Sequence, residues 1–177
     1  MKSIRVTIVI LTTAAAVTLP GSAQTSAPSP TPALAPLAFL TAHQWDAKLP
    51  DTPDGEKRKI HAQFNWAPTG HAIRISNQFV TEGKAAPYID GLYVWDPHQH
   101  VIVFWYVGAE GSFTQGTVRS EAGALVHEFT QTQADGKAAE FVARVTPHGN
   151  MAWDNEIAAR NEKGLTPIVK VTYEAAD

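Results

Sequence analysis

The chain has 177 residues, and its 14 lysines and arginines against 17 aspartates and glutamates give a formal charge of −3. This mildly acidic balance excludes the basic surface that nucleic acids and anionic membranes require. No cysteine is present, so a disulfide framework is excluded and a hydrophobic core must supply the stability.

The first 23 residues have the pattern of a secretory signal peptide. Lys2 and Arg5 give a positively charged start, residues 6–19 form an apolar stretch, and small residues precede a cleavage site after Ala23. The apolar stretch is shorter than the about 20 residues that a transmembrane helix needs. We therefore expect an exported protein, periplasmic or secreted, with no membrane span after signal cleavage.

Residues 24–36 are expected to form a disordered linker. They carry four prolines together with Ser, Thr and Ala, a composition typical of extended, unpacked chain. The remaining residues, 37–177, are enough for one domain. Within them, residues 37–45 are expected to contain a short helix with Leu37, Leu40 and Trp45 on one side.

From residue 59 onward, short segments of strand character alternate with turns. Residues 59–66, KIHAQFNW, place apolar side chains at every second position, which is typical of a half-buried strand. A Pro-Gly turn and a second alternating segment, residues 71–80, complete a hairpin. Further strands are expected at 88–95, 100–107, 113–119, 125–131, 139–145, 151–158 and 166–173, and a short one around Trp45.

This succession predicts an all-β protein, an up-and-down antiparallel barrel of nine or ten strands. Short connections make consecutive strands antiparallel neighbours, and closure into a barrel removes the unpaired edges of a long meander. A sandwich of two stacked sheets is the alternative.

Residues 101–107, VIVFWYV, are apolar on both faces of the expected strand. One face can fill the barrel, whereas the other must be covered from outside, either by residues 37–40 or by a partner subunit. We assign Trp105 to the barrel interior. The opposite face, made of Ile102, Phe104 and Tyr106, is then a possible homodimer surface.

The segment from GLYVWDP to EGSFTQGTV resembles exported lipocalin-like (calycin-type) β-barrel domains of bacteria, most of them of unknown function. The residues that carry the resemblance are Leu37, Leu40, Trp45, Gly91, Trp95, Asp96, Pro97, Gly111 and Gly116. The resemblance implies a closed antiparallel barrel with a central cavity, and it implies a ligand only loosely.

Metal and cofactor sites have little support in the sequence. His98 and His100 have a spacing that suits some zinc sites, but they lie in a predicted turn. A haem would need an inward histidine, for which only His127 is a candidate. We expect no metal and no cofactor. The sequence also lacks a Gly-x-Ser-x-Gly motif, a phosphate-binding glycine loop and paired inward carboxylates, so no catalytic residue is assigned.

The expected ligand site is the apolar interior of the barrel with a few polar groups among its walls, which is typical of small-molecule sites. An alternative is that each polar group is paired within a solid core. The candidate ligand-binding residues are Asn77, Trp105, His127, Phe129, Trp153, Asn155 and Tyr173.

The predicted function is therefore the binding of a small, largely apolar molecule inside the barrel. Two alternatives belong to other classes of protein. One is an isomerase or cyclase that uses His127 as a proton shuttle in the same cavity. The other is a structural module that forms a homodimer.

Overall fold

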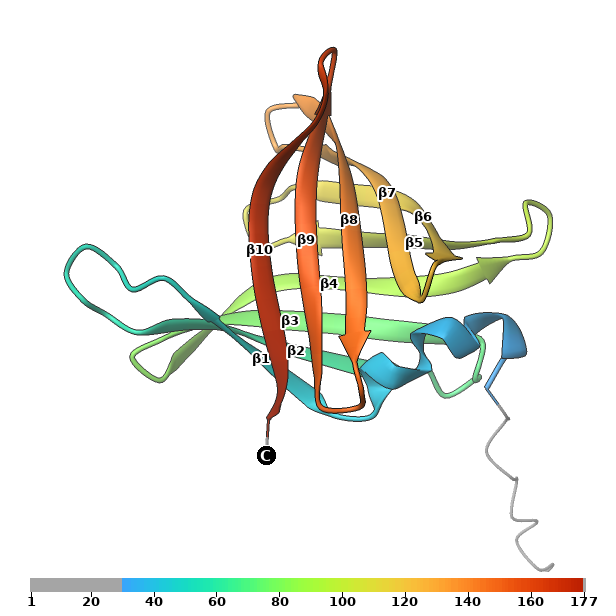
Figure 1. The fold of residues 1–177 in the computed structure, drawn as a ribbon, viewed down its shortest axis with the longest axis horizontal. Coiled ribbons are helices and arrows are strands. Elements are labelled where there is room, and N and C mark those ends of the chain that lie inside the picture. Colours follow the sequence, from blue (N-terminus) through green and yellow to red (C-terminus); the bar gives the residue numbers. More distant parts are fainter. Residues whose placement is uncertain (1–29, 177) are drawn as a thin grey trace, which may run out of the picture.

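The computed structural model describes residues 30–176, which form a β-barrel with one short helix (Figure 1). The predicted signal peptide, residues 1–23, lies outside the described residues. In residues 30–176 no helix is long and apolar enough to cross a membrane. The elements are the 3-10 helix η1 (Pro32–Thr41) and the strands β1 (Gln44–Leu49), β2 (Arg58–Trp66), β3 (Ala72–Thr81), β4 (Lys84–Asp96), β5 (Val101–Gly108), β6 (Phe113–Glu121), β7 (Ala124–Thr132), β8 (Ala138–His148), β9 (Ala152–Asn161) and β10 (Gly164–Ala176).

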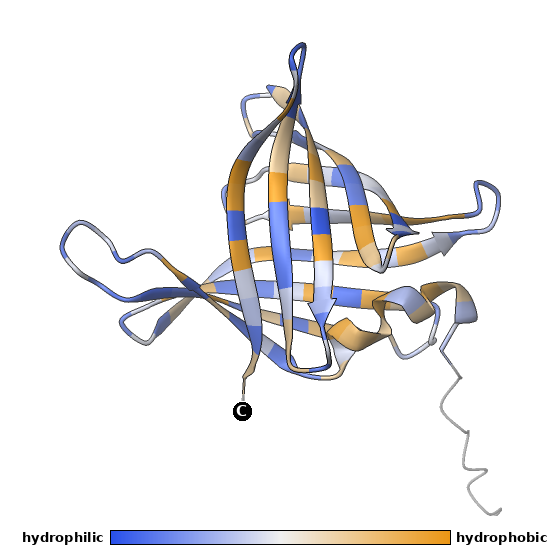
Figure 2. Cartoon of the chain, viewed as in Figure 1, coloured by the Kyte–Doolittle hydropathy of each residue, from blue (hydrophilic) through white to orange (hydrophobic). Residues whose placement is uncertain are grey.

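Ten antiparallel strands close into a single barrel. Every strand pairs with its neighbours in the sequence, and β1 pairs with β10, with Trp45 opposite Ala175 and Ala47 opposite Tyr173. The predicted up-and-down barrel is therefore confirmed, and the two-sheet sandwich is wrong. In Figure 1, β8–β10 run nearly at right angles to β2–β5, which shows how strongly the sheet coils as it closes. Bands of opposite hydropathy alternate along β8–β10 (Figure 2).

Two glycines allow the sheet to coil tightly on the side of β4–β7. Gly91 lies opposite Tyr106, and Gly116 lies opposite Phe129. A Cβ atom on Gly91 would lie 2.4 Å from the Tyr106 Cβ, and one on Gly116 would lie 2.6 Å from the Phe129 Cβ. The aromatic partner therefore occupies the space of the missing side chain, as expected for glycines at sharp bends in barrel strands.

The helix η1 closes one end of the barrel. Leu34 and Leu37 on this helix are fully buried, and the Trp45 indole Nε1 donates a hydrogen bond of 2.7 Å to the Leu40 carbonyl. The predicted short helix is confirmed, but the boundary predicted at residue 37 is too late, because Leu34 already belongs to the core. Pro32 and Pro36 fix the backbone of the first turns, so residues 32–36 pack as part of η1 instead of forming a linker.

The run at residues 101–107 is oriented opposite to the prediction. Ile102 and Phe104 are 5% and 3% exposed inside the barrel, whereas Trp105 and Val107 are 38% and 52% exposed on the outside. A strand that is apolar on both faces carries no information about which face is buried, and its neighbours decide. Here Tyr93 on β4 pairs with Phe104 and points into the core, so Phe104 does too.

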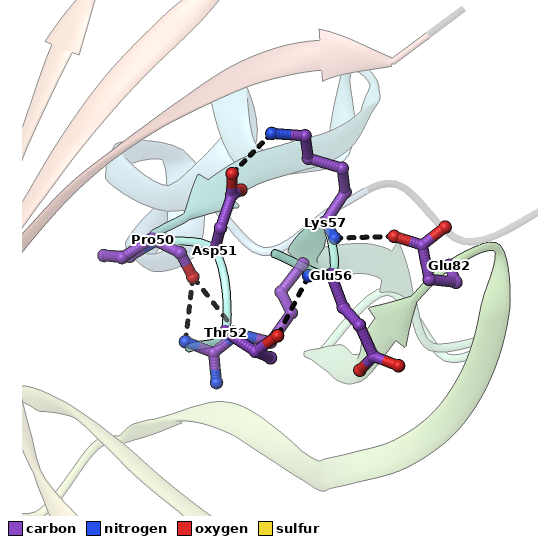
Figure 3. Close-up of polar contacts among 7 residues, drawn as sticks. Pro50, Asp51, Thr52, Glu56, Lys57 and Glu82 are labelled. Atoms are coloured by element: carbon purple, nitrogen blue, oxygen red, sulfur yellow. Dashed lines mark hydrogen bonds and ion pairs between the residues drawn. The ribbon is translucent and has the colours of Figure 1, made fainter. Parts of the chain in front are cut away.

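The β1–β2 loop, residues 50–57, lies at the end of the barrel opposite η1 (Figure 1). Its conformation is held by polar contacts (Figure 3). The Arg58 guanidinium donates two hydrogen bonds, of 3.1 and 2.8 Å, to the Pro50 carbonyl. The Lys57 amide donates one of 2.7 Å to the Glu82 carboxylate across the neighbouring turn. This end of the barrel therefore has an ordered rim and no helix across it within the described residues.

Candidate ligand site inside the barrel

The barrel encloses a cavity of about 90 Å³. Near η1 the core is tightly packed, and Trp45 and Ile73 are fully buried there. Toward the opposite end, Ile89, Tyr106 and Ile157 are only half-buried. The cavity therefore faces the end that η1 leaves uncovered. The cavity lining consists of Leu40, Phe64, Ile75, Asn77, Ile89, Tyr93, Phe104, Tyr106, His127, Phe129, Ala143, Val145, Trp153, Asn155, Ile157 and Tyr173.

Six of the seven predicted ligand-binding residues line this cavity: Asn77, His127, Phe129, Trp153, Asn155 and Tyr173. The seventh, Trp105, lies outside because the phase of β5 is opposite to the one expected. For the same reason, Phe104 and Tyr106, which line the cavity, were not predicted as site residues. Tyr93 was missed as well, although the register of β4 with the alternating strand β3, where Tyr93 pairs with Ile73, could have placed it inside.

Aromatic rings form much of the wall. Phe129 stacks on Phe141 with ring centroids 5.4 Å apart, and Phe104 meets Phe129 edge-on at 5.9 Å. On the other side of the cavity, Trp153 and Tyr173 are stacked at 3.9 Å with nearly parallel planes. Such flat surfaces favour aromatic or aliphatic guests through dispersion and the release of water.

His127 on β7 is the central polar group. Its Nε2 lies 3.3 Å from the Tyr93 hydroxyl, which is also buried. Burial lowers the pKa of His127 to about 4, although a backbone contact with Leu125 opposes this shift. Nδ1 has no hydrogen-bond partner among the described residues. His127 is therefore a neutral imidazole at physiological pH with one ring nitrogen unused.

Three other polar atoms of the lining lack partners. The Asn77 Oδ1, the Trp153 Nε1 and the Asn155 Oδ1 are inaccessible to water and make no hydrogen bond within residues 30–176. The alternative that every polar group of the core is paired internally is therefore wrong for these atoms. Leaving a buried polar atom unsatisfied costs about 1–3 kcal/mol. Asn77 lies on β3, whereas Trp153 and Asn155 lie on β9, and these two strands are not neighbours in the barrel.

The neutral state of His127 predicts a specific pH dependence of stability. Its pKa is lower in the folded protein than the about 6.5 of an unfolded chain, so the unfolded state binds more protons between these values. The free energy of unfolding should fall by about 3 kcal/mol between pH 7 and pH 4 through this residue alone. Urea unfolding gives the free energy of unfolding of the wild type and of His127→Leu at pH 7 and at pH 4. The contribution of His127 is the difference between the two proteins in how much this free energy changes with pH.

The exposed His98 serves as the matched control, because His98→Leu removes an imidazole that lies outside the barrel core. An identical pH response in the wild type and in His127→Leu would contradict the buried neutral imidazole.

His98 and His100, which were considered for zinc, lie in a turn. No group of three or more His, Cys, Asp or Glu side chains in residues 30–176 is arranged to hold a metal ion. Asp96 accepts hydrogen bonds from the backbone amides of His98 and Gln99, at 2.8 and 3.1 Å, so the Trp-Asp-Pro sequence builds a capped turn.

These features define a class: a closed, ten-stranded antiparallel barrel with a small, uncharged interior cavity. No family model matches the sequence, and no curated protein matches it. Among solved structures, the chain is similar to Rv2717c from M. tuberculosis, with a TM-score of 0.56 and 12% sequence identity. The match covers 84% of this chain and 100% of the other. At this identity the similarity shows the barrel fold alone.

Proposed function

We propose that this chain is an exported protein that binds a small, largely apolar molecule inside its barrel. The observation that carries the proposal is the combination of an aromatic cavity with unpartnered buried atoms on His127, Trp153, Asn77 and Asn155. Buried polar atoms in proteins nearly always have hydrogen-bond partners. The cavity beside these atoms is lined mainly by aromatic and aliphatic side chains, which favour a largely apolar guest.

The arrangement supports an orientation for the guest. His127 and Trp153 are buried, whereas Asn155, Tyr106 and Phe129 in the same lining are half-buried. A cavity of about 90 Å³ is smaller than the about 150 Å³ that holds a benzene molecule. The cavity would therefore hold only one end of a guest, and the rest would extend past the half-buried residues toward the uncovered end of the barrel.

Binding is better supported than isomerisation or cyclisation. A proton shuttle works best when its pKa lies near the working pH, whereas burial lowers that of His127 to about 4. Its hydrogen-bond partner Tyr93 is no better suited, because burial raises the pKa of this hydroxyl far above its ordinary value. The homodimer surface expected from Ile102, Phe104 and Tyr106 is not retained, because these side chains belong to the interior.

Hexan-1-ol is a suitable probe, and nuclear magnetic resonance of the indole N–H groups reports where it binds. The Trp153 signal should shift in a saturable manner, because the Trp153 side chain lines the cavity. The Trp105 signal should stay in place as an internal control, because this indole lies outside the barrel.

A cavity-filling variant sharpens this test. Ala143 is buried and lines the cavity, so Ala143→Leu should suppress the Trp153 shift. The exposed Ala138 provides the same substitution outside the cavity, and Ala138→Leu should bind as the wild type does. A Trp153 signal that never responds, or one that responds equally in Ala143→Leu, would overturn the proposal.

A further inference from the structure

A second hollow lies on the outer face of the barrel, across strands β6–β10, and is called the outer groove below. Its volume is about 620 Å³, within the range of about 300–1,000 Å³ that is typical of small-molecule sites. Strand alternation places it on the other side of the sheet from the interior cavity. On β7, His127 lines the interior, whereas its neighbours Val126 and Glu128 line the outer groove.

Four cationic side chains line the outer groove, and three of them are paired with carboxylates. The contacts are Arg119 to Glu128 at 2.7 Å, Arg160 to Glu128 at 2.9 Å and Lys170 to Glu156 at 2.6 Å. These pairs lie on the surface, and their charges largely cancel.

Arg144 on β8 is the fourth cation, and it contacts no carboxylate within residues 30–176. It lies directly opposite Glu156 in the sheet, but the Glu156 carboxylate contacts Lys170 instead. The Arg144 guanidinium donates a hydrogen bond of 3.5 Å to the Glu121 carbonyl, which is long for an N–H···O bond. Since a guanidinium has five N–H donors, this half-buried group keeps donors for a ligand.

An apolar strip lies beside Arg144 in the outer groove. Val142, Ala158 and Pro167 face each other across β8, β9 and β10, two residues or about 7 Å along the strands from Arg144. A β-bulge follows Pro167, so the extra residue Ile168 lines the groove as well. Ile168 is 56% exposed, and it lies on the β9–β10 hairpin, which extends beyond its neighbours (Figure 1).

This pattern of charge suits a carboxylate better than a phosphate. A guanidinium can bind either group through two parallel hydrogen bonds. Glu121 and Glu156 also line the groove, so the unpaired Arg144 can balance a single negative charge, whereas a dianion would be repelled by the two glutamates.

We propose that the outer groove binds monocarboxylates that carry an aliphatic chain. The carboxylate contacts Arg144, and the chain lies across Val142 and Ala158 toward Ile168. The outer groove and the interior cavity lie on opposite faces of the sheet, so this proposal is tested separately from the proposed function.

Octanoate is a suitable probe, titrated at pH 7 into the full chain and followed through the methyl signals of Ile168 by nuclear magnetic resonance. Octylammonium has the same chain with the opposite charge, and acetate has the same charge without the chain. Octanoate should shift the Ile168 signals in a saturable manner, and the other two should bind at least about 10-fold more weakly. The Trp153 indole signal should stay in place while the groove saturates, because this side chain lines the interior.

Two pairs of variants test the charged and the apolar part of the site. In Arg144→Gln the dissociation constant of octanoate should rise at least about 10-fold, whereas Arg74→Gln, at an exposed position outside the groove, should bind as the wild type does. Ile168→Ser should weaken binding several-fold. Met151 is also 56% exposed but does not line the groove, so Met151→Ser is its control.

The outcomes separate this proposal from the proposed function. If octylammonium binds as tightly as octanoate, or if Arg144→Gln binds octanoate as the wild type does, the recognition of a carboxylate is wrong. If acetate binds as tightly as octanoate, the apolar strip contributes nothing and the proposal is also overturned. If octanoate shifts the Trp153 indole signal and leaves Ile168 in place, the outer groove is not the site, whereas binding inside the barrel is supported.

Discussion

Gly91→Ala should destabilise the barrel by about 3 kcal/mol or more. The added Cβ atom would lie 2.1 Å from the Trp105 carbonyl oxygen and 2.6 Å from the Tyr106 Cα, both of which belong to the backbone of β5. A backbone that pairs with β4 on one side and β6 on the other cannot move away as the end of a flexible side chain could. The smallest possible side chain is therefore too large at this position.

Equilibrium urea unfolding measures the effect, with Gly136→Asn as the control. Gly136 has a φ of 84°, and a Cβ atom added there would have no neighbour within 4 Å. Asparagine tolerates this backbone conformation, so the control should lose less than about 1 kcal/mol. If Gly91→Ala were as stable as Gly136→Asn, the close approach of β4 and β5 would be wrong.

Leu37→Ala should have the second largest effect, a loss of about 3 kcal/mol. Leu37 is fully buried between η1 and the barrel, so truncation removes apolar contacts and leaves a cavity beneath the helix. The effect therefore tests whether η1 closes one end of the core.

Leu165→Ala is the matched control, because the same substitution is made on a side chain that is 55% exposed. Its free energy of unfolding should change by less than about 0.5 kcal/mol. Equal effects of the two substitutions on the urea midpoint would contradict the role of η1 as the cover of the barrel.

Much of the fold could be predicted because turns and alternation are local signals. Segments such as residues 59–66 place apolar side chains at every second position, which identifies both the strand and its buried face. The barrel itself followed from the shortness of the connections. These signals do not show which face of a strand points inward when both faces are apolar. For this reason Trp105 was predicted to lie inside the barrel.

The residues of the candidate site could also be predicted only where local sequence patterns identify the inner face of a strand. His127, Trp153 and Asn155 were predicted to point inward because the adjacent charged residues Glu128, Asp154 and Glu156 mark the outer face of their strands, and all three line the cavity. Tyr93, the hydrogen-bond partner of His127, comes from β4, where the sequence has no comparable alternation. That contact joins residues 34 positions apart in the chain, and it depends on the barrel closing with the register that the structure has.

The helix η1 was misjudged at its start for a related reason. Prolines at 32 and 36 are typical of extended linkers, but the same residues are compatible with the first turns of a helix. Only the burial of Leu34 against the barrel shows which of the two occurs.

Whether a guest occupies the interior of the barrel can be decided by nuclear Overhauser effects between hexan-1-ol and the protein in their complex. We expect contacts from the hydroxyl end of the probe to the Trp153 indole N–H, and from its terminal methyl to the rings of Phe129 and Tyr106. Contacts confined to the outer side chains Trp105 and Val107, with none to Trp153, would show that the interior is not the binding site.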